Sequence, residues 1–385
     1  MHFHFTFPTL PSLPPCPDSS ILYIIAHSRK RDCIMIRKSA ASRRTFLKNS
    51  VIGGMAAVAA LRAPHSVFSV PGAEPLHSTS RVSLTTGDDR ADNIFRGLKN
   101  LETEIKTAIG KRRIIIKPNN VHTAVPLCAT NAAGLEGILE FLKSIGKTDV
   151  TIAESAASAP TFEGYENYGY IPVAEKYAAK LVDLDQEKTE LVYLVDENDF
   201  HPHKIRMSSL LLDPDNFVIS AAVMKTHDRV VTTLSLKNIV FGAPIKDEGF
   251  RWGRDGKPGA KNDKPIAHGG GFKAVNFNLF SMAPRLAPDL AVIDGFQGME
   301  GNGPVGGTPV DHKVAVVSMD WLAADRTAVE LMGIDFAKVG YLNYCAQAGM
   351  GQGDLEKIEI IGPAIADHKK SYKLHDNVEK QLVWM

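Results

Sequence analysis

Short apolar runs alternate with segments of helical periodicity through most of the chain after residue 110. Short runs that are rich in β-branched residues are typical of strands buried on both faces. After Asn131, apolar residues recur at helical spacing and stop at Gly146, as expected of a capped helix. Strand, helix and strand in this order form a βαβ unit, which requires a parallel sheet. The predicted strands are 114–116, 150–153, 181–184, 191–195, 217–224, 290–293, 314–318 and 358–361.

The pattern therefore predicts an α/β fold: a single large domain around a mainly parallel β-sheet flanked by helices, over residues 78–362. Before the first strand the chain is polar, with a turn at 85–90. The polar tail, residues 363–385, is predicted to be peripheral. Besides the helix after Asn131, the predicted helices are 91–109, 173–180, 274–282, 320–332 and 336–349.

Two long segments lack any strand or helix pattern. Residues 244–271 carry several cationic side chains with Lys264 and His268 among them, and a loop of this length is typically a lid or binding loop. The alternative is a solvated excursion. Residues 295–309 are predicted to form a glycine-rich loop whose backbone N–H groups approach an anion, although the sequence matches no phosphate-binding motif. A plain flexible loop is the alternative.

The amino-terminal part contains Ser42-Arg43-Arg44-Thr45-Phe46-Leu47-Lys48, which is typical of a twin-arginine export signal. The apolar stretch that follows, 51–61, is well below the roughly 20 residues that span a bilayer, so no stable membrane span is expected. We assign 35–74 to the signal region. Because Met35 lies close to the arginine pair, residues 1–34 are interpreted as an upstream start-site extension. The protein is thus expected to be exported, periplasmic or extracellular, with the twin-arginine translocase as its partner during export.

The composition of the chain limits which partners and cofactors are expected. The 44 Lys and Arg residues nearly balance the 43 Asp and Glu residues, so the net charge gives no reason to expect nucleic acid as a partner. After the signal region only Cys128 and Cys345 remain, far apart in the sequence. No Cys-ligated iron–sulfur cluster is therefore expected within this chain. The two cysteines form either one disulfide or two buried thiols.

Polar side chains follow the ends of several predicted strands. If those strands are parallel, the side chains gather at one edge of the sheet, where α/β folds place their ligand sites. We expect a site for a small anionic molecule, because ammonium groups recur at these strand ends. The predicted ligand-binding residues are Lys117, Asn119, Lys225, Lys237, Asn238, Glu300 and Asn302; the predicted catalytic residues are His227, Glu154 and Asp294.

The role of each predicted catalytic residue has alternatives. His227 is a candidate general acid or base, a metal ligand, or a turn cap. Glu154 and Asp294 are candidates for a carboxylate pair that binds a divalent metal or transfers protons, but acidic residues after buried strands also cap helices. The lysines neutralise a carboxylate or phosphate, or they reach solvent. No cofactor is identified, and a divalent metal is one of the options.

Several short motifs lie at or near the ends of the predicted strands and helices. The motifs are Lys117-Pro118-Asn119, Glu154-Ser155, Lys225-Thr226-His227, Ser235-Leu236-Lys237-Asn238 with Gly242, the loop 300–304, Ala324-Asp325 and Leu331-Met332-Gly333. Together they resemble the family called domain of unknown function 362. The similarity covers residues 111–362, and it implies no agreed catalytic set. Some relatives join this domain to a ferredoxin-like module, which implies a redox link and a separate redox partner. This sequence departs from those relatives, since no cysteine cluster follows Gly362.

Two functional hypotheses follow from the sequence. The first is an exported enzyme that acts on a small anionic compound, with or without a divalent metal. The second is an exported protein that binds an anionic ligand and performs no catalysis.

Overall fold

The computed structural model describes residues 79–253 and 255–385. The predicted start-site extension (1–34) and twin-arginine region (35–74) lie outside these residues. In the part that is described, no helix is both long and apolar enough to cross a membrane.

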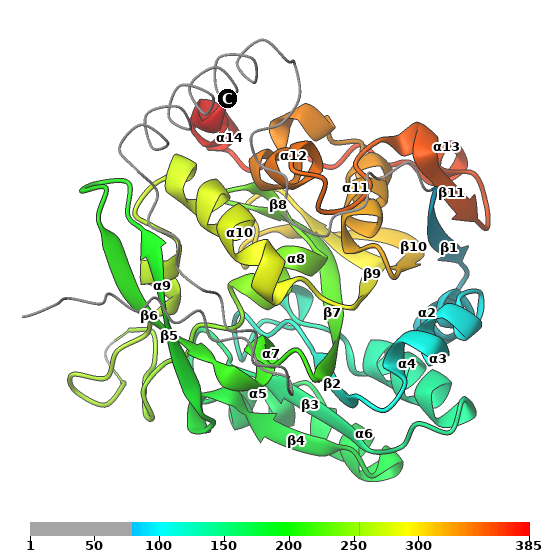
Figure 1. The fold of residues 1–385 in the computed structure, drawn as a ribbon, viewed down its shortest axis with the longest axis horizontal. Helices are drawn as coiled ribbons and strands as arrows, with labels where there is room; N and C mark the ends of the chain where they lie inside the picture. Colours follow the sequence, from blue (N-terminus) through cyan, green and yellow to red (C-terminus); the bar gives the residue numbers. More distant parts are fainter. Residues whose placement is uncertain (1–78, 254) are drawn as a thin grey trace, which may run out of the picture. The chain divides into compact units, whose positions relative to one another are not determined.

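A nine-stranded sheet forms the centre of the described domain, with the order β11-β1-β10-β9-β7-β2-β3-β4 and β8 paired to β7 (Figure 1). Five of its neighbouring pairs are parallel, including β2 with β3 and β7 with β9, and three are antiparallel. The predicted α/β fold with a mainly parallel sheet is confirmed. The strands are β1 (Ser80–Thr86), β2 (Arg113–Lys117), β3 (Val150–Glu154), β4 (Lys180–Asp183), β7 (Asn216–His227), β8 (Val231–Thr233), β9 (Leu290–Glu300), β10 (Thr308–Ser318) and β11 (Ile358–Ile361).

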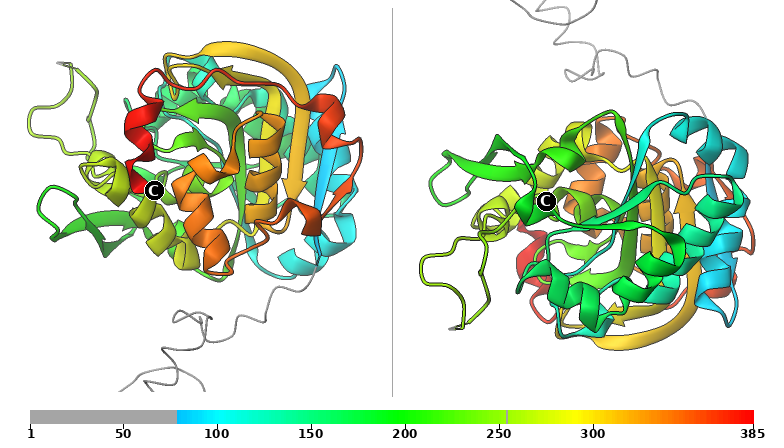
Figure 2. Two further views of the ribbon diagram at one scale, coloured as in Figure 1. Left: turned by 90° about the horizontal axis from the view of Figure 1, so that it is seen from above. Right: turned by 90° about the horizontal axis from the view of Figure 1, so that it is seen from below.

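Helices cover both faces of the sheet (Figures 1 and 2). Successive residues of β2 point to opposite faces, so Ile114 and Ile116 pack into one apolar core and Ile115 into the other. The first of these cores contains α2 (Arg90–Lys99), α3 (Glu102–Ile109), α4 (Ala132–Ser144) and α6 (Tyr170–Tyr177). The second contains α8 (Ser235–Val240), α10 (Phe272–Leu286), α11 (Trp321–Leu331) and α12 (Gly340–Gln347).

Strand β7 explains the continuous apolar run in the sequence. It pairs with β2 on one side and β9 on the other, and all twelve of its residues are buried. Because helices cover both faces, neither face of β7 requires polar residues. The predicted helix caps are also found: the Asn131 side chain accepts the backbone N–H of Ala133, and Asp320 accepts those of Leu322 and Ala323.

Several local predictions were wrong. The polar residues 80–86 form β1, in which only Val82 and Leu84 supply apolar side chains. The predicted helix 91–109 is divided at Asn100 into α2 and α3, and the predicted helix 336–349 is a short 3-10 turn (Phe336–Lys338) followed by α12.

The predicted strand 191–195 is β5 (Thr189–Val195). It lies outside the main sheet, in a two-stranded sheet with β6 (Pro202–Ser208).

The predicted glycine-rich loop 295–309 is mostly strand. β9 continues to Glu300 and β10 begins at Thr308, so the connection is only residues 301–307. Close packing explains the glycines, since a Cβ at Gly298 would lie 2.1 Å from the Tyr372 hydroxyl and one at Gly303 would lie 2.2 Å from the Thr226 carbonyl oxygen. Glycine at these two positions permits close contact between protein segments.

The tail after Gly362 packs against the domain through a few buried side chains. It carries α13 (Ile365–His368) and α14 (Val378–Gln381), and its Tyr372 and Gln381 side chains are buried. The Tyr372 hydroxyl lies 3.0 Å from Nδ1 of His312 in β10. The polar composition of the tail did not predict this packing, because a few buried side chains are enough to hold a short segment in place.

The two cysteines of the described domain are free thiols, and both are buried. Of the two alternatives that the sequence left open, the structure therefore has buried thiols and no disulfide between them.

Candidate functional site

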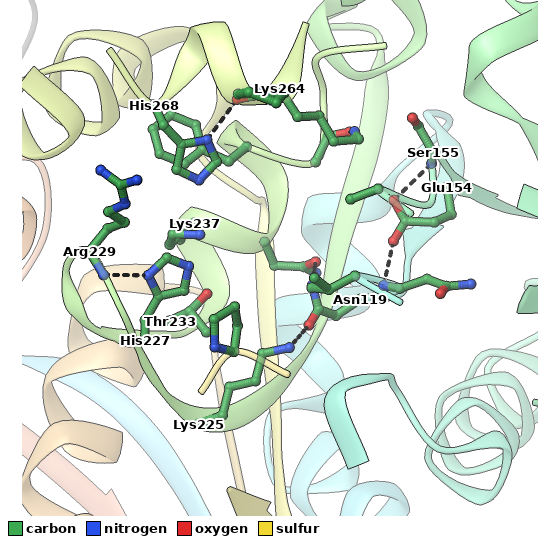
Figure 3. A pocket seen from close by; sticks show the side chains of 18 of the residues that line it. Asn119, Glu154, Ser155, Lys225, His227, Arg229, Thr233, Lys237, Lys264 and His268 are labelled. Atoms are coloured by element: carbon green, nitrogen blue, oxygen red, sulfur yellow. Dashed lines mark hydrogen bonds between the residues drawn. The ribbon is translucent and has the colours of Figure 1, made fainter. Parts of the chain in front are cut away.

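A cavity of about 370 Å³ lies at the carboxyl ends of β2, β3 and β7 (Figure 3). Helix α8 and the segment 252–268 complete its wall. Seven of the predicted site residues line it together: Lys117, Asn119, Glu154, Lys225, His227, Lys237 and Asn238. The lining residues that were not among the predicted site residues include Asn120, Asp228, Arg229, Thr233, Phe241, Trp252, Lys264 and His268.

The other three predicted residues are not part of the cavity lining. The Asp294 carboxylate is buried against Arg90, whose Nε lies 3.2 Å away, and it accepts the N–H of Phe296 at 2.9 Å. Glu300 accepts the backbone N–H of Lys373 at 2.8 Å. The Asn302 amide donates to Asp376 at 2.8 Å.

These contacts give the three side chains partners outside the cavity. Asp294 joins the sheet to α2, while Glu300 and Asn302 fix the carboxyl-terminal tail. The predicted carboxylate pair is not formed, since Glu154 and Asp294 bind different cationic partners and only Glu154 lines the cavity.

Glu154 and Lys117 form a buried ion pair at the ends of β3 and β2. The Lys117 ammonium lies 2.7 Å from Glu154 Oε1, and both side chains are at most 2% exposed. The other carboxylate oxygen accepts the N–H of Asn120 at 3.0 Å. Burial lowers the pKa of Lys117, and the charge of Glu154 opposes this shift. The charge of Lys117 is thus balanced within the protein.

Gly242, just after α8, is needed for this ion pair. A Cβ at this position would lie 2.0 Å from Cε of Lys117. Only glycine lets the end of α8 approach the lysine side chain so closely.

Lys225 lies near the end of β7 and is held by uncharged oxygens. Its ammonium donates to the Asn119 side-chain oxygen and, at 2.6 Å, to the Cys128 carbonyl. Asn119 is itself fixed, because its amide donates to Asn238 at 3.1 Å. Burial lowers the pKa of Lys225 to about 8.

Lys264 comes from the long segment after Pro244. Its ammonium donates to the carbonyl oxygens of Gly242, at 3.0 Å, and Pro244. Burial lowers its pKa to about 7. This part of the segment is cavity wall and not the solvated excursion that the sequence left open.

Lys237 lies on α8, with its ammonium 5.2 Å from the centre of the Phe241 ring. Burial lowers its pKa to about 7; the nearby Asp228 raises it and Lys225 lowers it further. Helix α8 is itself fixed in place, since the buried Asp325 carboxylate accepts the N–H groups of Ser235 and Leu236.

Two imidazole rings lie beside the Lys237 ammonium (Figure 3). The rings of His227 and His268 are stacked with their centres 6.4 Å apart and their planes at 9°. Burial and the charge of Lys237 lower the pKa of both rings, to about 3 for His268. Both are therefore neutral at pH 7.

The hydrogen bonds of the two rings assign different tautomers. His227 Nδ1 accepts the backbone N–H of Arg229 at 3.0 Å, which leaves its proton on Nε2. The Asp228 carboxylate, 3.1 Å from the same nitrogen, favours a charged ring, but burial and the surrounding cations outweigh it. His268 Nδ1 lies 2.6 Å from the Lys264 carbonyl, so Nδ1 donates and Nε2 has a free lone pair.

The cavity carries an excess of positive charge. Five cationic and two carboxylate side chains line it, and Glu154 is matched by Lys117. Within the described residues, no carboxylate forms an ion pair with Lys225, Lys237 or Lys264. Unbalanced buried cations favour an anionic ligand and repel a divalent metal. Residues 79–253 and 255–385 also contain no group of three or more His, Cys, Asp or Glu side chains arranged to hold a metal ion.

Comparison with known proteins identifies the family. The model described as a domain of unknown function, DUF362, matches residues 114–330, more than half of the chain. The chain belongs to the DUF362 family. A thylakoid-associated protein of Synechocystis sp. is 24% identical over 229 residues, and the match covers 59% of this chain and 65% of that relative's length. A crystal structure of a Thermotoga maritima protein shares 13% identity with a TM-score of 0.38, over 69% of this chain and 59% of that one.

In this DUF362 protein, two residues of the cavity wall do not follow any predicted strand, so they were not among the predicted site residues. Lys264 and His268 lie on and just after a short helix, α9 (Lys264–Ala267), within the predicted loop. Their only sequence signal was the density of cationic residues in a segment without secondary-structure pattern.

Proposed function

We propose that this protein binds a small organic anion in the cavity and is an enzyme that acts on it. The observation that carries the proposal is the group of buried lysines without a carboxylate partner: Lys225, Lys237 and Lys264. Burying an unbalanced ammonium group is unfavourable, so such groups persist mainly where a ligand supplies the missing charge. A carboxylate or phosphate group of the ligand is the counter-charge that fits.

The enzymatic part of the proposal rests on groups that exchange protons near neutral pH. Lysines whose pKa lies near 7, beside neutral imidazoles in a cavity, are typical of catalytic sites. The Nε2–H of His227 is a hydrogen-bond donor and the Nε2 lone pair of His268 is a hydrogen-bond acceptor. A protein that only binds an anion needs the cations but has no use for this complementary pair.

Anion binding is tested by titration calorimetry with phosphate and citrate. In Lys237→Met and Lys264→Met we expect the affinity to fall at least about tenfold, which corresponds to about 1.4 kcal/mol. Lys180→Met is the matched control, because the Lys180 side chain is 68% exposed on the far strand β4. Equal affinities in all three variants would contradict the proposal. Elemental analysis of the same protein preparation tests for a metal.

The pKa values of the buried lysines determine whether the affinity for an anion rises or falls with pH. An anion stabilises the protonated lysines, so binding takes up protons when their pKa values lie near 7 to 8. The affinity for citrate should therefore decrease as the pH rises from about 7 to 9. An affinity that increases over this range would show that other groups control binding.

We also propose that the twin-arginine sequence directs export of the folded protein. Replacing Arg43 and Arg44 with lysine should retain the protein in the cytoplasm of a bacterial host with a twin-arginine translocase, as judged by cell fractionation. Unchanged export would contradict this proposal.

A further inference from the structure

The Lys237 amine differs from the other buried lysine amines of the cavity. Lys117, Lys225 and Lys264 each donate hydrogen bonds to fixed oxygens of the protein. Within the described residues, the Lys237 amine has no hydrogen-bond partner or ion-pair partner, although only 8% of the residue is exposed. Its nitrogen lies in the cavity wall against the Phe241 ring. This amine is therefore available to a ligand and is not used to hold the fold.

The surroundings of Lys237 favour a nucleophilic amine. A lysine attacks a carbonyl carbon only when it is unprotonated, and burial among other cations promotes that state. Burial lowers the pKa of Lys237 to about 7, so a large fraction of this amine is neutral at physiological pH. An arginine or a solvent-exposed lysine would remain charged.

The two imidazoles supply a hydrogen-bond acceptor and a hydrogen-bond donor for such an attack. His268 Nε2 is a free acceptor, because Nδ1 of the same ring donates to the Lys264 carbonyl. His227 Nε2 carries a proton, because Nδ1 of that ring accepts from the Arg229 backbone. Both rings lie close enough to Lys237 for its charge to lower their pKa values.

We propose that Lys237 forms a Schiff base with the carbonyl group of a small oxo acid. This inference rests on the proposed function, because Lys225 and Lys264 are assigned to the carboxylate of the same ligand. The Lys237 nitrogen forms a bond to the carbonyl carbon, and the carbonyl oxygen takes up a proton to give a carbinolamine. The carbon–oxygen bond then breaks, and the oxygen leaves as water with the two hydrogens that the neutral amine has lost. His268 Nε2 accepts a hydrogen bond from the attacking nitrogen and the His227 Nε2–H donates one to the carbonyl oxygen. Both protons pass from the nitrogen to the oxygen, so no oxidant or metal is needed.

Reductive trapping tests the inference on the complete protein. Glyoxylate, the smallest aldehyde with a carboxylate, is added together with sodium borohydride, and modified lysines are located by peptide mass spectrometry. We expect carboxymethyl-lysine at Lys237 at least about tenfold above the level at the exposed Lys180. Excess citrate should suppress the labelling of Lys237 but not that of Lys180.

The dependence on pH separates the Schiff base from simple anion binding. Labelling of Lys237 should rise as the pH increases through about 7, since the neutral amine reacts, whereas citrate affinity falls. If Lys237 is no more labelled than Lys180 while citrate still binds, the Schiff base is refuted and the anion site is retained. If neither glyoxylate nor citrate interacts with the cavity, both proposals are refuted.

A variant distinguishes chemistry at Lys237 from reaction at a neighbouring lysine. In Lys237→Arg the positive charge is retained but the nucleophile is lost, so the cavity should lose carboxymethylation. Carboxymethylation that moves to Lys225 or Lys264 with undiminished yield would overturn the assignment to Lys237. The mapping in the wild-type protein decides the question even if this variant fails to fold.

Discussion

At the scale of single residues, Lys117 and Lys237 show two different reasons for a buried lysine. Lys117 has Glu154 at 2.7 Å and is part of the structure that holds two strand ends together. Lys237 has no ion-pair partner in the described part of the chain. One residue type in one cavity therefore has a structural role in the first case and, in our proposal, a role in ligand chemistry in the second.

This difference predicts opposite effects on stability. Lys117→Met leaves the Glu154 carboxylate buried without its counter-charge, and we expect the free energy of unfolding to fall by about 3 kcal/mol. Lys237→Met removes an unbalanced charge and no hydrogen bond, and we expect a rise on the order of 1 kcal/mol. Urea unfolding at pH 7 measures both. A loss of stability in Lys237→Met comparable to that in Lys117→Met would show that Lys237 has a structural role instead.

At the scale of elements, the candidate site depends on how the tail meets the end of β7. The Gln381 side chain, which is fully buried, accepts the N–H of Val231 at 2.6 Å and donates to the His227 carbonyl at 3.0 Å. Val231 has a positive φ of 66°, an unfavourable conformation for a β-branched residue. The tail thus fixes the turn between β7 and β8 from which His227 and Arg229 extend.

Removing this contact should affect both stability and binding. In Gln381→Ala a buried donor and a buried acceptor lose their partner, so we expect the free energy of unfolding to fall by about 2 kcal/mol. The affinity for citrate should also decrease, because the turn that carries His227 and Arg229 is no longer fixed. Glu379→Ala, an exposed position on the same helix, is the control. If Gln381→Ala behaves like that control in urea unfolding and calorimetry, the tail does not support the site.

At the scale of the whole domain, the sheet order explains why distant segments build one cavity. β7 lies between β2 and β9, and β3 follows β2, so the parallel strands β2, β3 and β7 end at the same edge. Helix α8 and the segment that contains Lys264 and His268 then cover this edge. Asp294 does not lie at the carboxyl end of β9, because the strand continues to Glu300; Asp294 is instead paired with Val223 of β7, within the sheet.

The sequence by itself determined the main features of the sheet and much of the site. Apolar runs predicted β2, β3 and β7, and the rule that parallel strands end at one edge brought together Lys117, Glu154 and Lys225. The caps at Asn131 and Asp320 were also readable, because capping depends on residues that are close in sequence. These predictions are correct because each depends only on a local sequence pattern or on the general rule that parallel strands end at one edge of a sheet.

Only the tertiary structure decided which residues meet across large sequence distances. Asp294 was predicted from its place after an apolar run, but the antiparallel pairing of β9 with β10 and the charge of Arg90 direct it away from the cavity. His268 and Gln381 come from segments without a strong pattern, and their roles arise from contacts with His227. Burial shifts the lysine pKa values, and the ion pair with Glu154 distinguishes Lys117 from Lys237. Both are properties of the packed domain and are absent from any short stretch of its sequence.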